Sequence, residues 1–402
     1  MSHKQHVARS PSATASCGPS RGALANGCIP WRPIPSPAES TKAATERGGV
    51  DGAMSQQPVV DRYGFMRKLD PHESEPAHIK EQRGRKERER VDKWKVMLAS
   101  SKNPYRIMRS RKFQQRVRKG IPESLRSEIW SRWLLEISEE DRDWARSIIA
   151  TSKDVLEQSD AGKDAIEAIR KDLSRTYPGH VRFQTAEGQV SLETVLMGYA
   201  AFDIEVGYCQ GMSFVAALLL MFLNELEALC ALKKLMTKSP WNMRDLFKPG
   251  MTAVGVRMHQ YDVILGRAAS KVSKHFRRLK FETSMYATHW FATVFTYNFP
   301  FFLVLRVWDV FLMQGWPIVI GTAVAFWRMY TKEICNVPSF EQLFETLKKL
   351  LGDFPVASAD PLMIDACHVA DKYATEDQLR GLEREYLKAH APPDRAALSD
   401  KR

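Results

Sequence analysis

Residues 169–178 hold an arginine placed where its side chain could reach out of the protein. Ile169 and Leu173 are spaced to face a core from one helix, and Pro178 forces that helix to end. Arg175 therefore stands at a helix C-terminus, three residues after Asp172. Such a pair is ordinary by itself, because an arginine there complements the helix dipole. Chemically, however, a guanidinium held by a carboxylate can bind phosphate oxygens in a bidentate fashion and stabilise the charge that develops during phosphoryl transfer.

A second segment, residues 206–212, places a glutamine just before an apolar helix expected over residues 213–223. Gly207 and Gly211 bracket a tight turn in which the backbone can approach a ligand closely. Gln210 could simply cap the helix, but it also stands where the helix dipole favours an anion. Its amide both donates and accepts, as is needed to orient a water molecule for attack.

The motifs of a self-contained active site are missing from the sequence. There is no G-x-x-x-x-G-K-[ST] loop for a nucleotide, no H-E-x-x-H and no G-x-S-x-G. The six cysteines are scattered without a C-x-x-C pair, so neither a metal site nor a disulfide scaffold is expected. The chain lacks a P-loop of its own but has an arginine that could stabilise a phosphate and a glutamine that could orient water. Together these features indicate that it acts in trans, on a nucleotide bound by another protein.

Helices must position both segments. From about residue 120 onward apolar residues recur at helical spacing, whereas strand-type alternation is almost absent. Three stripes are clear, and they comprise Ile121, Leu125, Ile129 and Trp133, then Ile166, Ile169 and Leu173, then Leu192, Val195, Leu196, Tyr199 and Phe202. The pattern predicts an all-α domain of many short helices over about residues 115–375. A charged tail, residues 376–402, follows and begins with a helix over residues 378–388.

The charge of the protein is concentrated in one place. The chain has 402 residues and a net charge of +12, and residues 80–119 alone carry that whole excess. We expect a solvated basic helix within a lead-in segment, residues 61–114, that leads into the domain. Contact of this helix with an anionic membrane or an acidic partner surface stays open. Nucleic-acid binding is disfavoured, because glutamates interrupt the basic residues and aromatic residues are few.

The N-terminal region has a different composition. Proline, glycine, serine and alanine account for 30 of residues 1–60, which predicts a disordered tail. No run reaches the roughly 18 apolar residues that a membrane span requires, and the N-terminus lacks the apolar core of a secretory signal. We therefore expect a cytoplasmic protein, with peripheral contact with endomembranes as the open alternative.

Several segments, in order, resemble the motifs of the TBC-domain Rab GTPase-activating proteins. The family's I-x-x-D-x-x-R-T motif is matched by Ile169, Asp172, Arg175 and Thr176, and its Y-x-Q-x-M motif by Tyr208, Gln210 and Met212. Its opening motif is matched, with Ile129 in the usual valine place, by Arg118, Gly120, Ile121, Pro122, Leu125, Arg126 and Trp130. Signatures of its second half resemble Tyr286, Trp290, Phe291, Arg306, Val307, Trp308, Asp309 and Gly315. Residues 61–65 look like a lead-in found in some members, so the resemblance covers about residues 61–375.

The resemblance implies an all-helical, two-lobed domain that accelerates GTP hydrolysis by a Rab-type small GTPase and so regulates vesicle trafficking. Arg175 would enter the partner's nucleotide site as an arginine finger, and Gln210 would replace the GTPase's own glutamine in positioning water. Support for the fingers or contact with the Rab would fall to Asp172, Thr176, Tyr208, Gly211, Arg118, Arg126 and Trp130.

Other roles are also open. For Arg126 and Trp130 a structural role is as open as a functional one. Tyr208 is expected in the core or behind the fingers. Arg306 and Asp309 need partners, because they stand inside an apolar stretch. The protein would need no cofactor and would not itself be an enzyme, since GTP and Mg²⁺ belong to the partner. The alternative is a non-catalytic Rab-binding scaffold, which the presence of both fingers disfavours.

Overall fold

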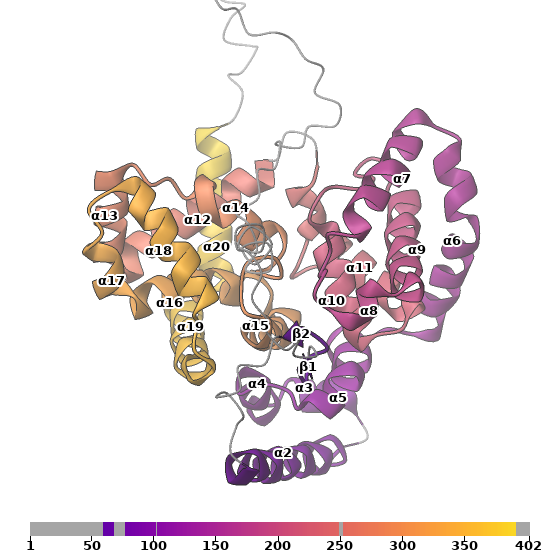
Figure 1. Cartoon of the computed structure of the whole chain (residues 1–402), viewed down its shortest axis with the longest axis horizontal. Coiled ribbons are helices and arrows are strands. Elements are labelled where there is room, and N and C mark those ends of the chain that lie inside the picture. The colour runs from indigo at the N-terminus through magenta and orange to yellow at the C-terminus, as the bar shows by residue number, and fades with distance from the viewer. Residues whose placement is uncertain (1–58, 68–76, 102, 249–251, 391–402) are drawn as a thin grey trace, which may run out of the picture.

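The computed structural model describes residues 59–67, 77–101, 103–248 and 252–390, and this part of the chain is almost wholly helical and forms two lobes (Figure 1). The all-α, two-lobed prediction is therefore confirmed. The expected disordered tail, residues 1–60, lies outside the described residues except for its last two, as do residues 391–402 of the C-terminal tail.

The first lobe is built around α9 (Ala186–Phe202), whose predicted apolar stripe is buried except for Phe202, which is exposed. The helices that pack against α9 are α6 (Glu139–Glu157), α7 (Asp160–Leu173), α8 (Val181–Gln184), α10 (Met212–Phe222) and α11 (Glu225–Thr237). The predicted apolar helix over residues 213–223 is α10, and its residues 212–220 are buried all round. A helix that is apolar on every side belongs in a core, so α10 holds its N-terminus in a fixed place.

The second lobe centres on α16 (Trp316–Met329), which packs along α19 (Ala359–Tyr373). A Cβ on Gly321 would lie 2.4 Å from the Ala366 carbonyl oxygen, so the close approach of these helices requires glycine. The remaining elements are η2 (Met243–Leu246), α12 (Thr252–Ala268), α13 (Ser270–Leu279), α14 (Ser284–Ala292), α15 (Phe301–Gln314), α17 (Thr331–Cys335), α18 (Phe340–Gly352), η3 (Val356–Ser358) and α20 (Glu376–Ala389). The helix predicted over residues 378–388 is α20, and it packs against α12.

The basic segment forms three helices where the sequence predicted one. They are α2 (Ala77–Leu98), α3 (Pro104–Met108) and α4 (Arg111–Arg118). The segment is not wholly solvated, because Trp94 and Phe113 are buried with their ring centroids 5.6 Å apart. These aromatic residues attach the basic helices to the rest of the protein.

The first stripe predicted from the sequence is not one regular helix. Pro122 is the N-cap residue of α5 (Glu123–Glu128). A π-helical turn, η1 (Ile129–Leu134), follows α5 directly. Ile121 therefore precedes the helix. Residues 59–67 add a small antiparallel hairpin of β1 (Val59–Val60) and β2 (Met66–Arg67). Across the part of the chain that the structure describes, no helix is long and apolar enough to cross a bilayer.

Candidate functional site

The arginine singled out in the sequence stands at the end of α7, as predicted. The helix ends at Leu173, and Arg175 turns back to donate from Nε to Asp172 Oδ1 over 2.8 Å. A second contact joins its Nη2 to the same oxygen. The Arg175 side chain is 44% exposed, whereas the Asp172 side chain is only 5% exposed. A buried carboxylate thus orients a guanidinium whose other donors face outward.

The second oxygen of Asp172 also has a partner. The Tyr208 hydroxyl donates to Asp172 Oδ2 over 2.5 Å, from the segment that carries the glutamine. Burial raises the pKa of Tyr208 well above its ordinary value, and the charge of Asp172 raises it further. Tyr208 is therefore a neutral donor at physiological pH, and Asp172 connects the two predicted motifs.

A third link fixes the end of α7 to the start of α10. The Thr176 hydroxyl donates to the Asp172 carbonyl oxygen over 2.7 Å and lies 2.8 Å from the Ser213 hydroxyl. Both Thr176 and Ser213 are buried. Hydrogen bonds between buried groups are costly to leave unmade, so the two helix ends hold a fixed separation.

The glutamine occupies the turn that leads into α10. Gly207 and Gly211 have φ of 59° and 103°, so both adopt conformations that favour glycine. A Cβ on Gly211 would also lie 3.2 Å from Thr293 Cγ2. With its amide oxygen turned toward Arg175, Gln210 places that oxygen 2.7 and 2.9 Å from the two terminal guanidinium nitrogens. The structure therefore brings Arg175 and Gln210 into direct contact.

An ion pair that the sequence did not reveal supports this turn. Asp203 follows α9, accepts from Arg244 of η2 over 2.6 and 2.7 Å, and accepts from the Tyr199 hydroxyl over 2.9 Å. Burial alone would raise the pKa of Asp203, but the hydrogen bonds from Arg244 and Tyr199 outweigh it, so the pKa lies below its usual value. The Gly207 amide also donates to the Asp203 carbonyl over 2.7 Å. No motif indicated Arg244, since its partner lies 41 residues away.

Both side chains line an open cleft of about 640 Å³ between α7 and the turn before α10. One wall consists of small and charged residues of α7, and the other carries Ile204, Glu205 and Phe247. Arg175 and Gln210 therefore lie where a partner's group could reach them.

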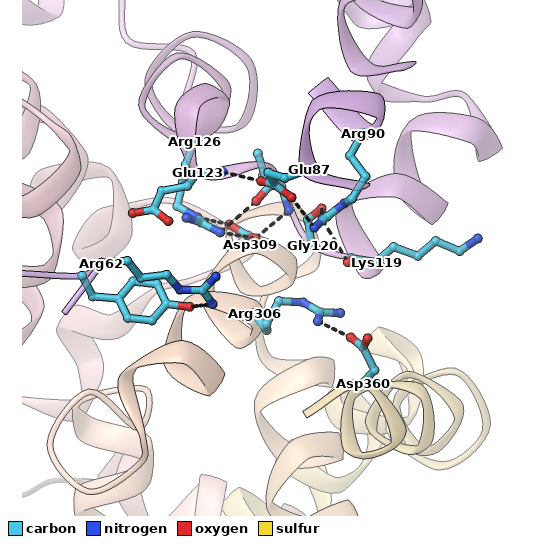
Figure 2. Close-up of polar contacts among 12 residues, drawn as sticks. Arg62, Glu87, Arg90, Lys119, Gly120, Glu123, Arg126, Arg306, Asp309 and Asp360 are labelled. Carbon is cyan, nitrogen blue, oxygen red and sulfur yellow. Dashed lines mark hydrogen bonds and ion pairs between the residues drawn. The ribbon is translucent and has the colours of Figure 1, made fainter. Parts of the chain in front are cut away.

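The residues of the opening motif lie elsewhere. Asp309 of α15 is fully buried and accepts from Arg126 Nε over 3.0 Å, from the Trp130 indole over 2.9 Å and from the Ile121 amide over 2.9 Å. Figure 2 shows Arg126 and Asp309 in this arrangement. Arg126 is 5% exposed and Trp130 is not exposed at all, which favours the structural role that the sequence leaves equally open for them. Support for the fingers or contact with a partner by these two residues stays a prediction.

Arg118 is also separate from the fingers. Its two terminal nitrogens each lie 2.6 Å from an oxygen of Asp371 on α19, and one of them donates to Gln314. Arg306 pairs with Asp360 and donates to the Arg118 carbonyl over 3.2 Å, which supplies the partner expected for it (Figure 2). Arg118 ties α4 to the second lobe, and the expectation that it supports the fingers or contacts the Rab stays a prediction.

The fold is that of a TBC domain. A sequence profile of the Rab-GTPase-TBC domain matches residues 123–335, and the chain belongs to this family. The chain is 31% identical over 300 residues to the Ecotropic viral integration site 5 protein homolog of Homo sapiens, covering 73% of this chain and 35% of that protein. It is 30% identical over 293 residues to the GTPase-activating protein GYP5 of Eremothecium gossypii, covering 72% and 33%. The chain thus spans about a third of the length of these relatives.

Two solved structures share the fold. The crystal structure of the Chlamydomonas flagellar RabGAP TBC domain superposes with a TM-score of 0.59 at 24% identity, covering 77% of this chain and 99% of that one. The Ypt/Rab-GAP domain of Gyp1p superposes with a TM-score of 0.60 at 18% identity, covering 71% and 99%. At these identities the likeness establishes the fold alone.

Proposed function

We propose that this protein is a GTPase-activating protein for a Rab-type small GTPase, and that Arg175 and Gln210 act in trans on the partner's GTP. One observation carries the proposal: a half-exposed guanidinium, held from behind by the buried Asp172, touches a glutamine amide at an open cleft. The GTP and Mg²⁺ would belong to the partner, so the protein supplies no cofactor of its own.

Each side chain has a distinct role in this mechanism. The fork of Arg175 would leave Gln210 and stabilise the charge that develops on the transferred phosphoryl group. The Gln210 amide, released from that contact, would accept from and orient the attacking water. Asp172 keeps the guanidinium aimed outward during this exchange, because Tyr208 and Arg175 occupy both of its oxygens.

The test is single-turnover hydrolysis by a panel of GTP-loaded Rab GTPases, with and without this protein. Stimulation of at least one Rab, lost in Arg175→Ala but kept in Arg170→Ala, is expected. Arg170 is the matched control, because it is an exposed arginine near the end of the same helix that pairs with Glu193. Binding of a GTP-loaded Rab without any stimulation would instead identify a non-catalytic scaffold.

A role in vesicle trafficking follows from the proposed substrate, since Rab GTPases act on membranes. The basic helix α2 supports peripheral contact with an anionic surface, because Lys86, Arg88, Lys93 and Lys95 are exposed on it. Sedimentation with vesicles that contain phosphatidylserine, compared with neutral vesicles, tests this contact.

A further inference from the structure

The lead-in residues 59–67, here called the strap, form a hairpin with a rigid turn. Asp61 Oδ1 accepts from the amides of Tyr63 and Phe65 over 2.9 and 3.0 Å. Its other oxygen lies 2.9 Å from Arg67 Nε. One carboxylate therefore fixes the turn that presents Tyr63, Gly64 and Phe65 to the rest of the protein.

The strap hydrogen-bonds to residues 179–181, a short distance along the chain after Arg175. The Met66 amide donates to the Gly179 carbonyl over 2.8 Å, and the Val181 amide donates to the Gly64 carbonyl over 2.9 Å. The His180 ring contributes a third contact, because its Nε2 lies 2.9 Å from the Tyr63 carbonyl oxygen. Residues 176–181, here called the finger base, therefore take several of their polar contacts from the strap.

Phe65 joins the finger base to the second lobe. Its ring centroid lies 5.8 Å from that of Tyr177, 4.9 Å from that of His180 and 4.9 Å from that of Phe301. Phe301 is the first residue of α15, which lies between the two lobes in Figure 1, close to the strap. The same side chain thus contacts the segment that carries the finger and the central helix.

The finger base needs such support because it is strained. Tyr177, two residues after Arg175, has φ of 46°, in the left-handed region that bulky residues avoid. Such conformations persist only where the surroundings over-determine them. Here the Tyr177 hydroxyl donates to the Thr296 carbonyl over 2.9 Å, and its ring packs edge-on against Phe65, Phe214 and Phe301.

We infer that the strap is a positioning element for the arginine finger: it holds the finger base in its strained conformation, so that Arg175 is pre-aligned before a partner binds. This inference rests on the proposed function of Arg175. It assigns to Phe65 and Gly64 an effect on the rate of the stimulated reaction, transmitted through residues 176–181. Misplacing a reacting group by about 1 Å can cost on the order of 100-fold in rate.

Gly64 offers a sharp way to detach the strap. It has φ of 91°, and a Cβ there would lie 2.5 Å from His180 Nε2, so Gly64→Ala should lift the turn away. Gly179→Ala is the matched control, because a Cβ at that position meets nothing within 4 Å and the carbonyl that the strap uses is retained. Phe65→Ala removes the aromatic bridge by a second route, and Phe65→Leu keeps most of the apolar contact.

The first measurement needs no GTPase. Limited trypsin digestion reports how often the finger base opens, since cleavage after Arg175 requires the buried Thr176 to leave its site. Relative to cleavage after the exposed Arg146 of α6, cleavage after Arg175 should rise about tenfold or more in Gly64→Ala and Phe65→Ala. It should stay at the wild-type rate in Gly179→Ala.

The second measurement is single-turnover GTP hydrolysis with the Rab that the wild-type protein stimulates best. The maximal stimulated rate should fall about 10- to 100-fold in Gly64→Ala and Phe65→Ala, with partial recovery in Phe65→Leu. The half-saturating protein concentration should change by no more than about threefold, because alignment acts mainly on the transition state.

The outcomes separate the two proposals. If the wild-type protein stimulates no Rab, the proposed function fails, while the digestion still decides whether the strap orders the finger base. If Gly64→Ala and Phe65→Ala leave cleavage after Arg175 unchanged, or if they raise it while the maximal rate stays within about twofold of Gly179→Ala, the strap is not a positioning element.

Discussion

Two Asp–Arg pairs in this protein use the same chemical groups for opposite purposes. In the first lobe Asp172 holds Arg175, whose side chain is 44% exposed. Between the lobes Asp309 holds Arg126, whose side chain is 6% exposed. Both carboxylates are buried, and the two arginines differ in exposure.

The difference lies in what occupies the remaining donors. Arg126 gives its remaining contact to the Ile121 carbonyl over 2.9 Å, and Asp309 is fully engaged, so this network is closed. Arg175 instead directs its terminal nitrogens at Gln210 beside an open cleft. An exposed contact can be exchanged for a partner's group at little cost, whereas breaking a buried one leaves a charge without compensation. Exposure of the arginine thus distinguishes a group that can act on another protein from one that holds the fold.

The largest predicted effect is on Arg175. Arg175→Ala should lower stimulated GTP hydrolysis by roughly 10³–10⁵, the range of arginine fingers. The free energy of unfolding should fall less than in Arg126→Ala, because the Arg175 side chain is already 44% exposed and its ion pair is partly solvated. Arg175→Lys should restore little, because an ammonium lacks the planar fork. Single-turnover hydrolysis and urea unfolding measure the two effects, and a variant that retains rates within a few-fold of wild type would sink the assignment.

Arg126 should show the opposite pattern. Arg126→Ala leaves Asp309 buried without its cation, so unfolding should become easier by about 3–5 kcal/mol. Hydrolysis stimulated per folded molecule should change little, because Arg126 does not reach the cleft. Chemical denaturation of Arg126→Ala beside Arg175→Ala gives the comparison directly. A stability loss below about 1 kcal/mol would show that the closed network is not structurally important.

The next largest effect is predicted for Gln210, which contacts Arg175. If it positions water, Gln210→Ala should lower stimulated hydrolysis by about 10²–10³, as loss of one transition-state hydrogen bond does. The wild-type protein should still stimulate a Rab whose switch glutamine is replaced by alanine, and Gln210→Ala should not. Gln210→Glu should do no better, because a carboxylate cannot donate and adds negative charge near the phosphate.

All four combinations of wild-type and alanine-substituted Gln210 and Rab glutamine are required in this experiment. Full stimulation of wild-type Rab by Gln210→Ala would reduce Gln210 to a residue of the helix start. Arg170→Ala again serves as the control for surface changes in this lobe.

The sequence predicted the Asp172–Arg175 pair better than the Asp309–Arg126 pair. Asp172 and Arg175 lie within one helical turn of each other, and Gly211 marks the start of α10, so local rules placed the fingers at two helix ends. Contacts between distant residues carry no such signal. Arg126 and Asp309 are 183 residues apart, and that distance explains why Arg126 was equally open to a functional role. The helical class was predictable from spacing, whereas the π-helical turn that aims Trp130 at Asp309 was not, since the spacing by four suggested one regular helix.

The strap was visible in the sequence only as a short resemblance, because its partners are distant in the chain. Phe65 meets Tyr177 and His180 through the fold, and nothing in the apolar pattern of the first lobe requires a partner there. The sequence predicted Arg175 and Gln210 at two helix ends, but not the hairpin beside them.

The smallest predicted effect concerns His180, which links the finger base to the strap. Its Nε2 donates to the Tyr63 carbonyl and its Nδ1 accepts from the Arg182 amide over 3.2 Å, so the ring is neutral with both nitrogens engaged. Burial lowers the pKa of His180 below its ordinary 6.5, and the charge of Arg182 lowers it further, while the Tyr63 carbonyl and Asp61 oppose the shift without reversing it.

The sign of the pH effect follows from this lowered pKa. Where the strap is undocked, His180 takes up its proton as the pH falls through about 6.5, before the docked form does. Docking therefore has its full stability above that pH and loses stability below it, until the pH reaches the docked pKa. His180→Asn keeps an acceptor at the position of Nδ1 for the Arg182 amide, but it is too short to replace Nε2 at Tyr63 and does not titrate. The advantage in Tm of the wild-type protein over His180→Asn should shrink between about pH 7.5 and pH 5. A constant or growing advantage would mean that the neutral ring does not hold the strap, and that the finger base is supported by Phe65 and the backbone alone.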